Sequence, residues 1–437
     1  MQRRDAVVRN MQSIQISTAE KSGSNISIGD FFRRYPVLLL FTSITLIANI
    51  AYMTMIPLVP LYFRSHFHVT HEIYIGIAIS AYVTSETILK PLTGSLGDRF
   101  RRTGLVIMAL LIATITPHLL AHSRSTMSFI IIRMVDGVGA ALLWPSIIAL
   151  FADATDEEHR ATAMSLFTTC MLIGMGAGMT LSTFLKAWLG TYQYVFIMIS
   201  AVACCALIAT LLLNKKISIS IKQRQKHLET SDEKPGFMES IRKITSNRSA
   251  VKLISVLIFL AFAQMFGTSM LTPITVLFTS DELGWQEKEL WKMFLGAGVV
   301  LALLAIPAGR MADRIGKENA VKLGMGISSV CLLLMVGIRQ PWTLVLAGIG
   351  YGVSFAIGAP AWMALVTHGE WADLRGTVLG VVTSFQGAGA IAGPIFGTTI
   401  YHHFGHYSPF AVTGLILLFC LVISLFWLRP IKPAEEK

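Results

Sequence analysis

The amino-acid sequence predicts an all-α membrane protein with 12 transmembrane helices in two pseudo-symmetric six-helix bundles and with both termini in the cytoplasm. Three observations lead to this prediction: the composition, the apolar runs, and an internal repeat. Of the 437 residues, 54% are hydrophobic and 14% are charged, whereas a soluble domain has roughly 25% charged residues. A chain with so much apolar surface requires lipid as its solvent.

Twelve apolar runs follow a polar and basic segment that ends near residue 35. In lipid a backbone can satisfy its hydrogen bonds only internally, so a spanning helix needs ~20 mostly apolar residues. The runs cover residues 36–62, 73–94, 103–122, 127–150, 162–187, 192–213, 250–279, 291–311, 318–338, 341–366, 376–401 and 407–428. The first segment has no apolar core, so we expect no cleavable signal peptide and expect the first run to act as the signal.

The polar residues 214–249 divide these runs into six and six. We therefore expect five regions along the chain. They are a cytoplasmic N-terminal tail (1–35), an N-terminal six-helix bundle (36–213), a cytoplasmic basic linker (214–249), a C-terminal six-helix bundle (250–428) and a cytoplasmic C-terminal tail (429–437).

The internal repeat is clearest in the segment Gly94-Ser-Leu-Gly-Asp98-Arg99, which returns 215 residues later as Gly309-Arg-Met-Ala-Asp313-Arg314. The same shift also relates residues far from this segment. The further pairs are Gly137 and Gly352, Pro145 and Pro360, Arg160 and Arg375, Gly174 and Gly389, Gly178 and Gly393, and Asn49 and Gln264. One shift without gaps over this distance indicates two copies of a single module.

The positive charges predict the orientation. With both termini on one side of the membrane, that side carries 28 of the 36 Lys and Arg residues and the other side carries six. Loops rich in Lys and Arg stay in the cytoplasm, so both termini are expected there. The basic linker is then expected to contact anionic lipid head groups. No aromatic side chains alternate with its lysines, so we expect no binding of nucleic acid.

The repeated segment resembles the signature loop of the major facilitator superfamily. The second copy matches it closely, whereas the first copy has Arg101 at the position of the last glycine, which is Gly316 in the second copy. The resemblance covers essentially the whole chain and implies two six-helix halves. It also implies a cytoplasmic gate formed by Gly94, Asp98, Arg99, Gly309, Asp313 and Arg314. A basic loop that only sets the topology is the alternative.

The fourth run contains Arg133-Met-Val-Asp136-Gly137-Val-Gly139-Ala-Ala, which resembles the motif R-x-x-Q-G-x-G-A-A of the drug:proton antiporter branch with 12 helices. Here Asp136 stands in place of the glutamine. Three residues apart on a helix, Arg133 and Asp136 share a face. Charges at this depth cost at least ~2.5–3.5 kcal/mol each, so they are expected to face a cavity or a partner. A structural ion pair is the alternative.

The second run contains Glu86 and Lys90, which are four residues apart and also share a face. The repeat places Leu301 at the position of Glu86, so any role of this carboxylate belongs to one half only. For proton coupling we expect Asp136 first and Glu86 second, with Arg133 controlling when Asp136 releases its proton. The alternative for Glu86 and Lys90 is a structural pair.

The antiporter branch also has a glycine–proline motif in its fifth helix. The eleventh run here has this motif intact as Gly389, Gly393 and Pro394, whereas the fifth run has Gly174 and Gly178 followed by methionine. These glycines would also allow tight packing between the halves.

The resemblance further implies that runs one, four, seven and ten line a central cavity. The repeat pairs Asn49 with Gln264 and Asp136 with Tyr351 across it. A mostly apolar pocket with few polar groups suits amphipathic organic molecules, although packing or lipid contact is the alternative for each aromatic residue. The expected cavity residues are Asn49, Tyr52, Arg133, Asp136, Trp144, Gln264, Phe266, Tyr351, Phe355 and Trp362.

Together these features predict a secondary active transporter that exports small amphipathic organic molecules, such as a drug, metabolite, siderophore or lipid, by proton-coupled alternating access. A proton-coupled uptake symporter for a small organic solute is the alternative, and a receptor or sensor is a third class. The chain has no P-loop, nucleophile elbow or zinc pattern, so we expect no enzyme, cofactor or metal. We expect a monomer in a bacterial cytoplasmic (inner) membrane.

Six of the eleven histidines lie in two loops that this topology places outside. Because imidazole titrates near pH 6.5, a pH-sensing or metal site is one hypothesis, and ordinary exposed residues are the alternative. The histidines are His66, His68, His71, His402, His403 and His406, with Glu72 beside them.

Overall fold

The computed structural model describes residues 28–67, 71–99, 101–156, 159–225, 248–337, 341–367 and 375–427. Every regular element in these ranges is helical, so the predicted all-α class is confirmed. A short helix α2 (Ile28–Arg34) comes first, and a 3-10 turn η2 (Glu287–Glu289) precedes α11. The long helices are α3 (Pro36–His66), α4 (Ile73–Arg99), α5 (Arg102–Ala121), α6 (Thr126–Asp153), α7 (Arg160–Leu189), α8 (Tyr192–Gln225), α10 (Arg248–Asp281), α11 (Leu290–Ile315), α12 (Lys317–Gly337), α13 (Pro341–Thr367), α14 (Arg375–Phe404) and α15 (Ser408–Trp427).

Each predicted run coincides with one long helix to within about five residues, except that α8 continues well past its apolar part to Gln225. Ten of the described helices are long and apolar enough to cross a membrane. The two long helices that do not meet this criterion are α4, which carries Glu86 and Lys90, and α11, whose apolar part is Leu290–Val300. The chain is therefore a multi-pass integral membrane protein.

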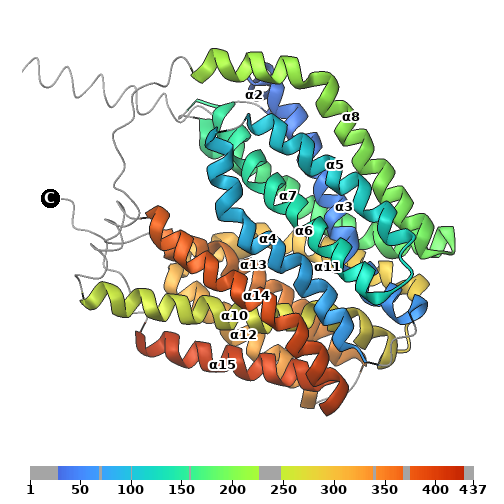
Figure 1. Ribbon diagram of the computed structural model, residues 1–437. Helices are drawn as coiled ribbons and strands as arrows, with labels where there is room; N and C mark the ends of the chain where they lie inside the picture. The colour runs from blue at the N-terminus through green and yellow to red at the C-terminus, as the bar shows by residue number, and fades with distance from the viewer. Residues whose placement is uncertain are drawn as a thin grey trace, which may run out of the picture.

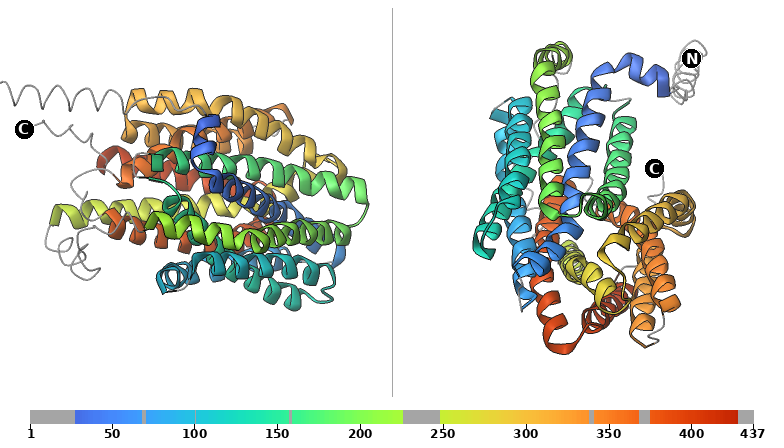
Figure 2. Two further views of the ribbon diagram at one scale, coloured as in Figure 1. Left: turned by 90° about the horizontal axis from the view of Figure 1, so that it is seen from above. Right: turned by 90° about the vertical axis from the view of Figure 1, so that its right-hand side faces the viewer.

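The helices form two groups, which lie close together at one end and farther apart at the other (Figure 1 and Figure 2). Helices α3 to α8 pack mainly on one another, as do α10 to α15. The groups touch where α4 packs on α14, α7 on α11, and α3 on α10. In Figure 1 they lie close together at the lower right and diverge toward the left. We call the close end, where α3 ends at His66 and α10 at Asp281, the outer end, and the opposite one the inner end, following the predicted topology.

Close helix contacts explain the repeated glycines. A Cβ atom on Gly178 would lie 2.7 Å from the carbonyl oxygen of Ile50 in α3, and one on Gly393 would lie 2.6 Å from that of Phe266 in α10. The helix pairs α3–α7 and α10–α14 are equivalent in the repeat, so both copies use glycine for the same contact. These glycines therefore pack helices within each group, rather than between the two groups as the sequence had indicated.

The two copies of the signature loop differ in their turn. In the second copy Gly316 follows α11 with a φ of +86°, a conformation that favours glycine, whereas the equivalent Arg101 before α5 has a φ of −62°. The first turn therefore has no need of glycine, and the next residue, Arg102, forms an ion pair with Asp153 at the end of α6. The surroundings of the gate residues 94, 98, 99, 309 and 313 lie outside the described part of the structure.

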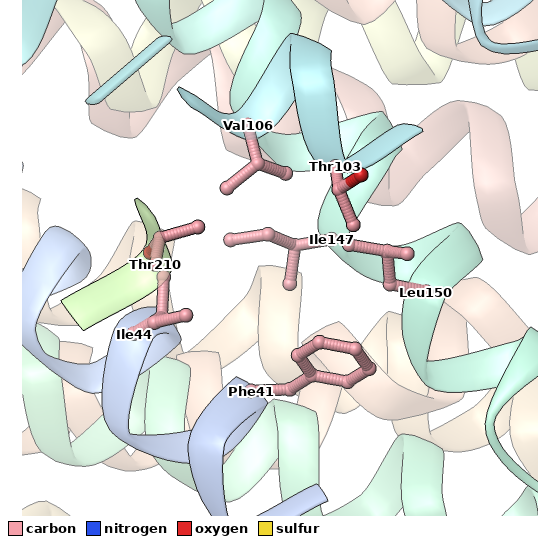
Figure 3. Close-up of a pocket in the computed structure, with 7 residues that line it drawn as sticks. All are labelled: Phe41, Ile44, Thr103, Val106, Ile147, Leu150 and Thr210. Atoms are coloured by element: carbon pink, nitrogen blue, oxygen red, sulfur yellow. The ribbon is translucent and has the colours of Figure 1, made fainter. Parts of the chain in front are cut away.

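The first group holds a small cavity near the inner end (Figure 3). It measures about 10 Å³, close to the space of one water molecule. Figure 3 shows apolar side chains and two threonines around it, including Phe41, Ile147 and Thr210. A space of this size and lining is not a site for an organic substrate.

Candidate functional site

A buried ion pair lies in the middle of the first group of helices. The guanidinium of Arg133 donates to the carboxylate of Asp136, and the two side chains are 6% and 3% exposed. The hydroxyl of Thr116 in α5 donates to the other carboxylate oxygen at 2.9 Å, and it also lies 3.0 Å from the carbonyl oxygen of Ile112. The guanidinium stands 4.4 Å from the centre of the Tyr82 ring in α4. Both charges are thus compensated by protein groups, as burial in a membrane requires.

Two glycines beside the pair bring the surrounding helices close. A Cβ atom on Gly137 would collide with the carbonyl oxygen of Tyr82 in α4. One on Gly139 would lie 2.8 Å from Ile112 in α5 and 3.1 Å from the hydroxyl of Tyr52 in α3. The motif that resembles the antiporter branch therefore provides both the charges of α6 and the space that lets three helices close around them.

Glu86 lies close to this pair on the neighbouring helix α4. Its carboxylate is 15% exposed, makes a 2.7 Å ion pair with Lys90 and acts electrostatically on Asp136 and Tyr82. Lys90 is 47% exposed. The three residues predicted for proton coupling, Arg133, Asp136 and Glu86, are thus brought together, and Lys90 leads from them toward the inner end.

Aromatic rings cover one side of the charged cluster. The ring of Tyr52 has its centre 6.2 Å from that of Tyr82 and 5.7 Å from that of Trp144. The Tyr52 hydroxyl and the Nε atom of Arg133 are buried, and neither has a hydrogen-bond partner among the residues that the structure describes. Buried polar atoms almost always have a partner, so these two atoms are available to a ligand or to water.

The second group holds a polar cavity of about 30 Å³ between α10, α12 and α13. It is neutral: the hydroxyls of Ser328 and Ser354 bond to each other, and the hydroxyl of Tyr351 bonds to Thr268. Among the predicted cavity residues, Gln264, Tyr351 and Phe355 line it. The predicted substrate residues therefore fall into two sets, one inside each group of helices.

The remaining predicted residues lie elsewhere. Asn49 is fully buried and donates from Nδ2 to the carbonyl oxygen of Met171 in α7 at 2.6 Å. Phe266 packs edge-on against Phe396 of α14, with ring centres 5.5 Å apart. Trp362 belongs to the apolar core of the second group, and its indole nitrogen is buried without a hydrogen-bond partner in the described part of the chain.

A charged network that the sequence analysis did not predict joins the two groups at the outer end. Arg64 at the end of α3 binds both carboxylate oxygens of Asp281 at the end of α10, at 2.5 and 2.9 Å. Tyr401 of α14 donates to the same carboxylate at 2.6 Å. One signal was present in the sequence, because Arg64 and Asp281 are opposite charges at the outer ends of equivalent helices.

The histidines extend this network between α4 and α14. His402 contacts Glu72 at 2.7 Å through Nδ1 and His71 at 3.2 Å through Nε2, and Glu72 lies 3.7 Å from Arg64. We call Arg64, His71, Glu72, Asp281, Tyr401 and His402 the outer network. Among the described residues, no group of three His, Cys, Asp or Glu side chains is placed to hold a metal ion.

The other outer histidines have separate surroundings. His406 contacts Glu282 at 2.6 Å, and His66 stacks on Tyr62. His403 lies beside His402 on α14, and His68 is outside the described residues.

Two groups of long apolar helices, the first of which encloses a buried ion pair, define a multi-pass membrane protein with the architecture of a transporter. The chain matches the model of the Major Facilitator Superfamily over residues 41–367 and 257–437, and it belongs to this superfamily. Its members are transporters rather than enzymes. The predicted resemblance is therefore confirmed.

Relatives and solved structures agree with this membership. Multidrug resistance protein 2 of Bacillus subtilis (strain 168) is 23% identical over 357 residues, which are 80% of this chain and 86% of the relative. Multidrug resistance protein MdtG of Klebsiella pneumoniae (strain 342) is 24% identical over 392 residues, covering 88% and 91%. The fold resembles that of the human organic anion transporter MFSD10 (TETRAN), with a TM-score of 0.63, 18% identity, and coverage of 90% of this chain and 99% of that one. It also resembles a bacterial homologue of the human lysosomal transporter Spinster, with a TM-score of 0.69, 15% identity, and coverage of 92% and 99%.

Proposed function

We propose that this protein exports small amphipathic organic molecules in exchange for protons, by alternating access between two six-helix bundles. The multidrug resistance names of its bacterial relatives support export. The observation that carries proton coupling is the Arg133–Asp136 pair, a carboxylate and a guanidinium buried at membrane depth beside two unpartnered polar atoms. Such groups are costly in lipid and commonly mark proton or substrate pathways.

The charge state of Asp136 is the proposed coupling element. A proton on Asp136 removes its attraction for Arg133, leaves the guanidinium to the Tyr82 ring, and neutralises the negative charge that a substrate would use. Substrate and proton then compete for one arrangement of charges, which is the requirement for exchange. Glu86 is the second carboxylate of the site, and Lys90 holds it in the state described here.

The two sets of predicted cavity residues fit an amphipathic substrate. Tyr52 and Trp144 offer an aromatic wall beside the charged cluster. Gln264, Tyr351 and Phe355 offer neutral polar and aromatic groups from the other half. In the state described here each set lies inside its own group of helices, and in the proposed cycle the two sets come to line one cavity between the bundles, as is usual for sites at a repeat interface.

Alternating access is supported by where the two groups meet. The hydrogen bonds and ion pairs between Arg64 and Asp281 and between Ser80 and Ile391 hold them together from the outer end inward. We assign this arrangement to an inward-facing state. The Spinster homologue, which is similar in fold, was solved inward-facing and unoccupied. In the opposite state, the two signature loops at Gly94–Arg99 and Gly309–Arg314 would close the inner end.

The proposed setting follows from the charge distribution. The predicted domains, with bundles at 36–213 and 250–428 and a linker at 214–249, place both termini and the linker in the cytoplasm. The linker contacts anionic lipid there. Bacterial relatives support a bacterial inner membrane as the location, and a monomer suffices because each chain contains both bundles.

Transport by the purified protein in liposomes tests the proposal. The probes are a lipophilic cation (tetraphenylphosphonium), a neutral amphiphile and an amphipathic anion, with a pH dye inside the vesicles. For protein oriented with its inner end outward, we expect uptake of a probe when the lumen is acidic, accompanied by proton release. Uptake that is independent of the proton gradient would contradict the proposal. Uptake driven only by the reversed gradient would indicate a symporter.

A further inference from the structure

Three side chains at the outer end form a chain of hydrogen-bonding atoms between the two groups of helices. Glu72 at the start of α4 contacts Nδ1 of His402 at the end of α14, at 2.7 Å. The other ring nitrogen of His402 lies 3.2 Å from Nδ1 of His71, which precedes α4. One imidazole of α14 is therefore held between two side chains just before α4, across the contact between the bundles.

The number of protons that these three side chains can bind follows from their hydrogen-bond donors and acceptors. With both imidazoles neutral, His402 donates from Nδ1 to the Glu72 carboxylate and accepts at Nε2 from His71. With one more proton, His402 is a cation that donates to both neighbours, and the carboxylate balances its charge. A second added proton makes His71 a cation as well. Two N–H donors would then face each other across 3.2 Å, which repels the two rings.

The surrounding charges strengthen this limit. Arg64 stands 3.7 Å from the same Glu72 carboxylate, so the doubly protonated site would have three cations around one anion. His403 lies beside His402 on α14, with the two ring centres 5.0 Å apart, and is outside the chain of hydrogen-bonding atoms described here. Asp281 already binds both Arg64 and Tyr401, and His406 is paired with Glu282. The nearby carboxylates are thus occupied by their own partners.

We propose that Glu72, His402 and His71 form a proton-binding site, the outer proton site, that holds one added proton while the bundles are closed and binds a second only when their outer ends separate. Acid then favours separation, because the open state takes up the extra proton. Separation breaks the remaining cross-bundle bonds of the outer network, including Arg64 to Asp281. This site is distinct from Asp136, which lies inside one bundle.

The proposal is tested by hydrogen–deuterium exchange of the full chain in lipid nanodiscs at pH 7.5 and 5.5, with rates corrected for the intrinsic effect of pH. The readout is the protection of the outer turns of α3, α4, α10 and α14. A difference of one bound proton shifts the equilibrium tenfold per pH unit. For the wild type we therefore expect protection to fall by about ten- to a hundredfold at pH 5.5.

The variants separate the proton from the hydrogen bonds. Glutamine retains a donor and an acceptor but binds no proton, so His402→Gln keeps the outer end closed at pH 7.5 and loses most of the response at pH 5.5. His71→Gln gives the same result independently, should the first variant fail to fold. His403→Gln is the matched control on the same helix and keeps the wild-type response. Asp136→Asn also keeps it, which separates this site from the proposed coupling site.

Three results would overturn the proposal. One is a wild-type protection that changes less than about threefold between the two pH values after correction, since a one-proton linkage requires more. Another is a wild-type response in both His402→Gln and His71→Gln. The third is a response that disappears equally in His403→Gln, which would assign the titration to the general charge of this surface.

Discussion

The two halves of the molecule share their packing but differ in their buried chemistry. Glycines at equivalent positions, such as Gly178 and Gly393, let α7 approach α3 and α14 approach α10 in the same way. The charged cluster is not repeated. The shift of 215 residues places Tyr351 at the position of Asp136, Gly348 at that of Arg133, and Leu301 at that of Glu86. The duplicated module is thus a scaffold, and at these three positions only the first copy carries charged residues.

This difference has a physical consequence. Buried charges require compensation on every side. In the first half Arg133 and Asp136 compensate each other, and a hydroxyl and an aromatic ring contact the pair. The hydroxyls of the second half satisfy one another and leave a cavity of about 30 Å³. The first half is suited to a change of charge, and the second to neutral groups of varied shape.

The largest effect is expected from removing the charge of Asp136. Asp136→Asn keeps the shape and loses the proton-binding group, so we expect gradient-driven transport in liposomes to fall at least about a hundredfold, as for loss of an essential acid–base group. Tyr351→Phe at the equivalent position changes probe affinity and keeps the dependence on the gradient. Unchanged coupling in Asp136→Asn would contradict the assignment, and loss in Glu86→Gln alone would transfer the role to α4.

Breaking the ion pair is expected to have the next largest effect, now on stability. Arg133→Met leaves a buried carboxylate without its partner, which costs ~3–5 kcal/mol in the free energy of unfolding. The double variant Arg133→Met/Asp136→Leu removes both charges and recovers most of this loss, because a hydrophobic pair of similar volume is nearly neutral in stability. Unfolding by detergent titration measures both. A single variant as stable as the double one would show that water reaches the pair.

Much of this fold was predictable because membrane helices have a local signature. Apolar length placed the twelve long helices, ten of which are apolar enough to span a membrane, and α8 differs because its polar continuation to Gln225 has no such signature. The proximity of Arg133 to Asp136 was also predictable, since it depends only on helix periodicity. The contacts of Thr116 and Tyr82 with this pair were not predictable, because they depend on how α5 and α4 are rotated relative to α6.

The outer network was missed for a different reason. Arg64 and Asp281 are 217 residues apart, and they meet only in a state in which the bundles are closed at this end. A sequence shows that two charges lie at the same membrane surface, but it does not specify which conformation brings them together. The pairing of His402 with His71 has the same origin.

A smaller effect is expected from Thr116, which shows how much the first half depends on its hydrogen bonds. Thr116→Val removes the donor to the Asp136 carboxylate, and a hydrogen bond to a charged group contributes ~1.5–3 kcal/mol. Thr114→Val is the matched control on the same helix, because that hydroxyl bonds only to its own helix at Leu110. We expect the control to change the free energy of unfolding by less than about 0.5 kcal/mol. Equal losses in the two variants would contradict the role of Thr116.

The smallest effect on stability is expected at the packing glycines that the two halves have in common. In Gly178→Ala and Gly393→Ala the new methyl group meets backbone oxygens at 2.7 and 2.6 Å, and overpacking of this kind costs ~1–3 kcal/mol. Alanine also favours a helix by ~1 kcal/mol over glycine, so the net loss is expected to be only ~1 kcal/mol in each half. Gly348→Ala, with no atom within 4 Å of the added group, retains the helix gain alone and is expected to stabilise the protein. Thermal unfolding in detergent measures all three variants, and a loss confined to one half would show that the scaffold is not equivalent in the two copies.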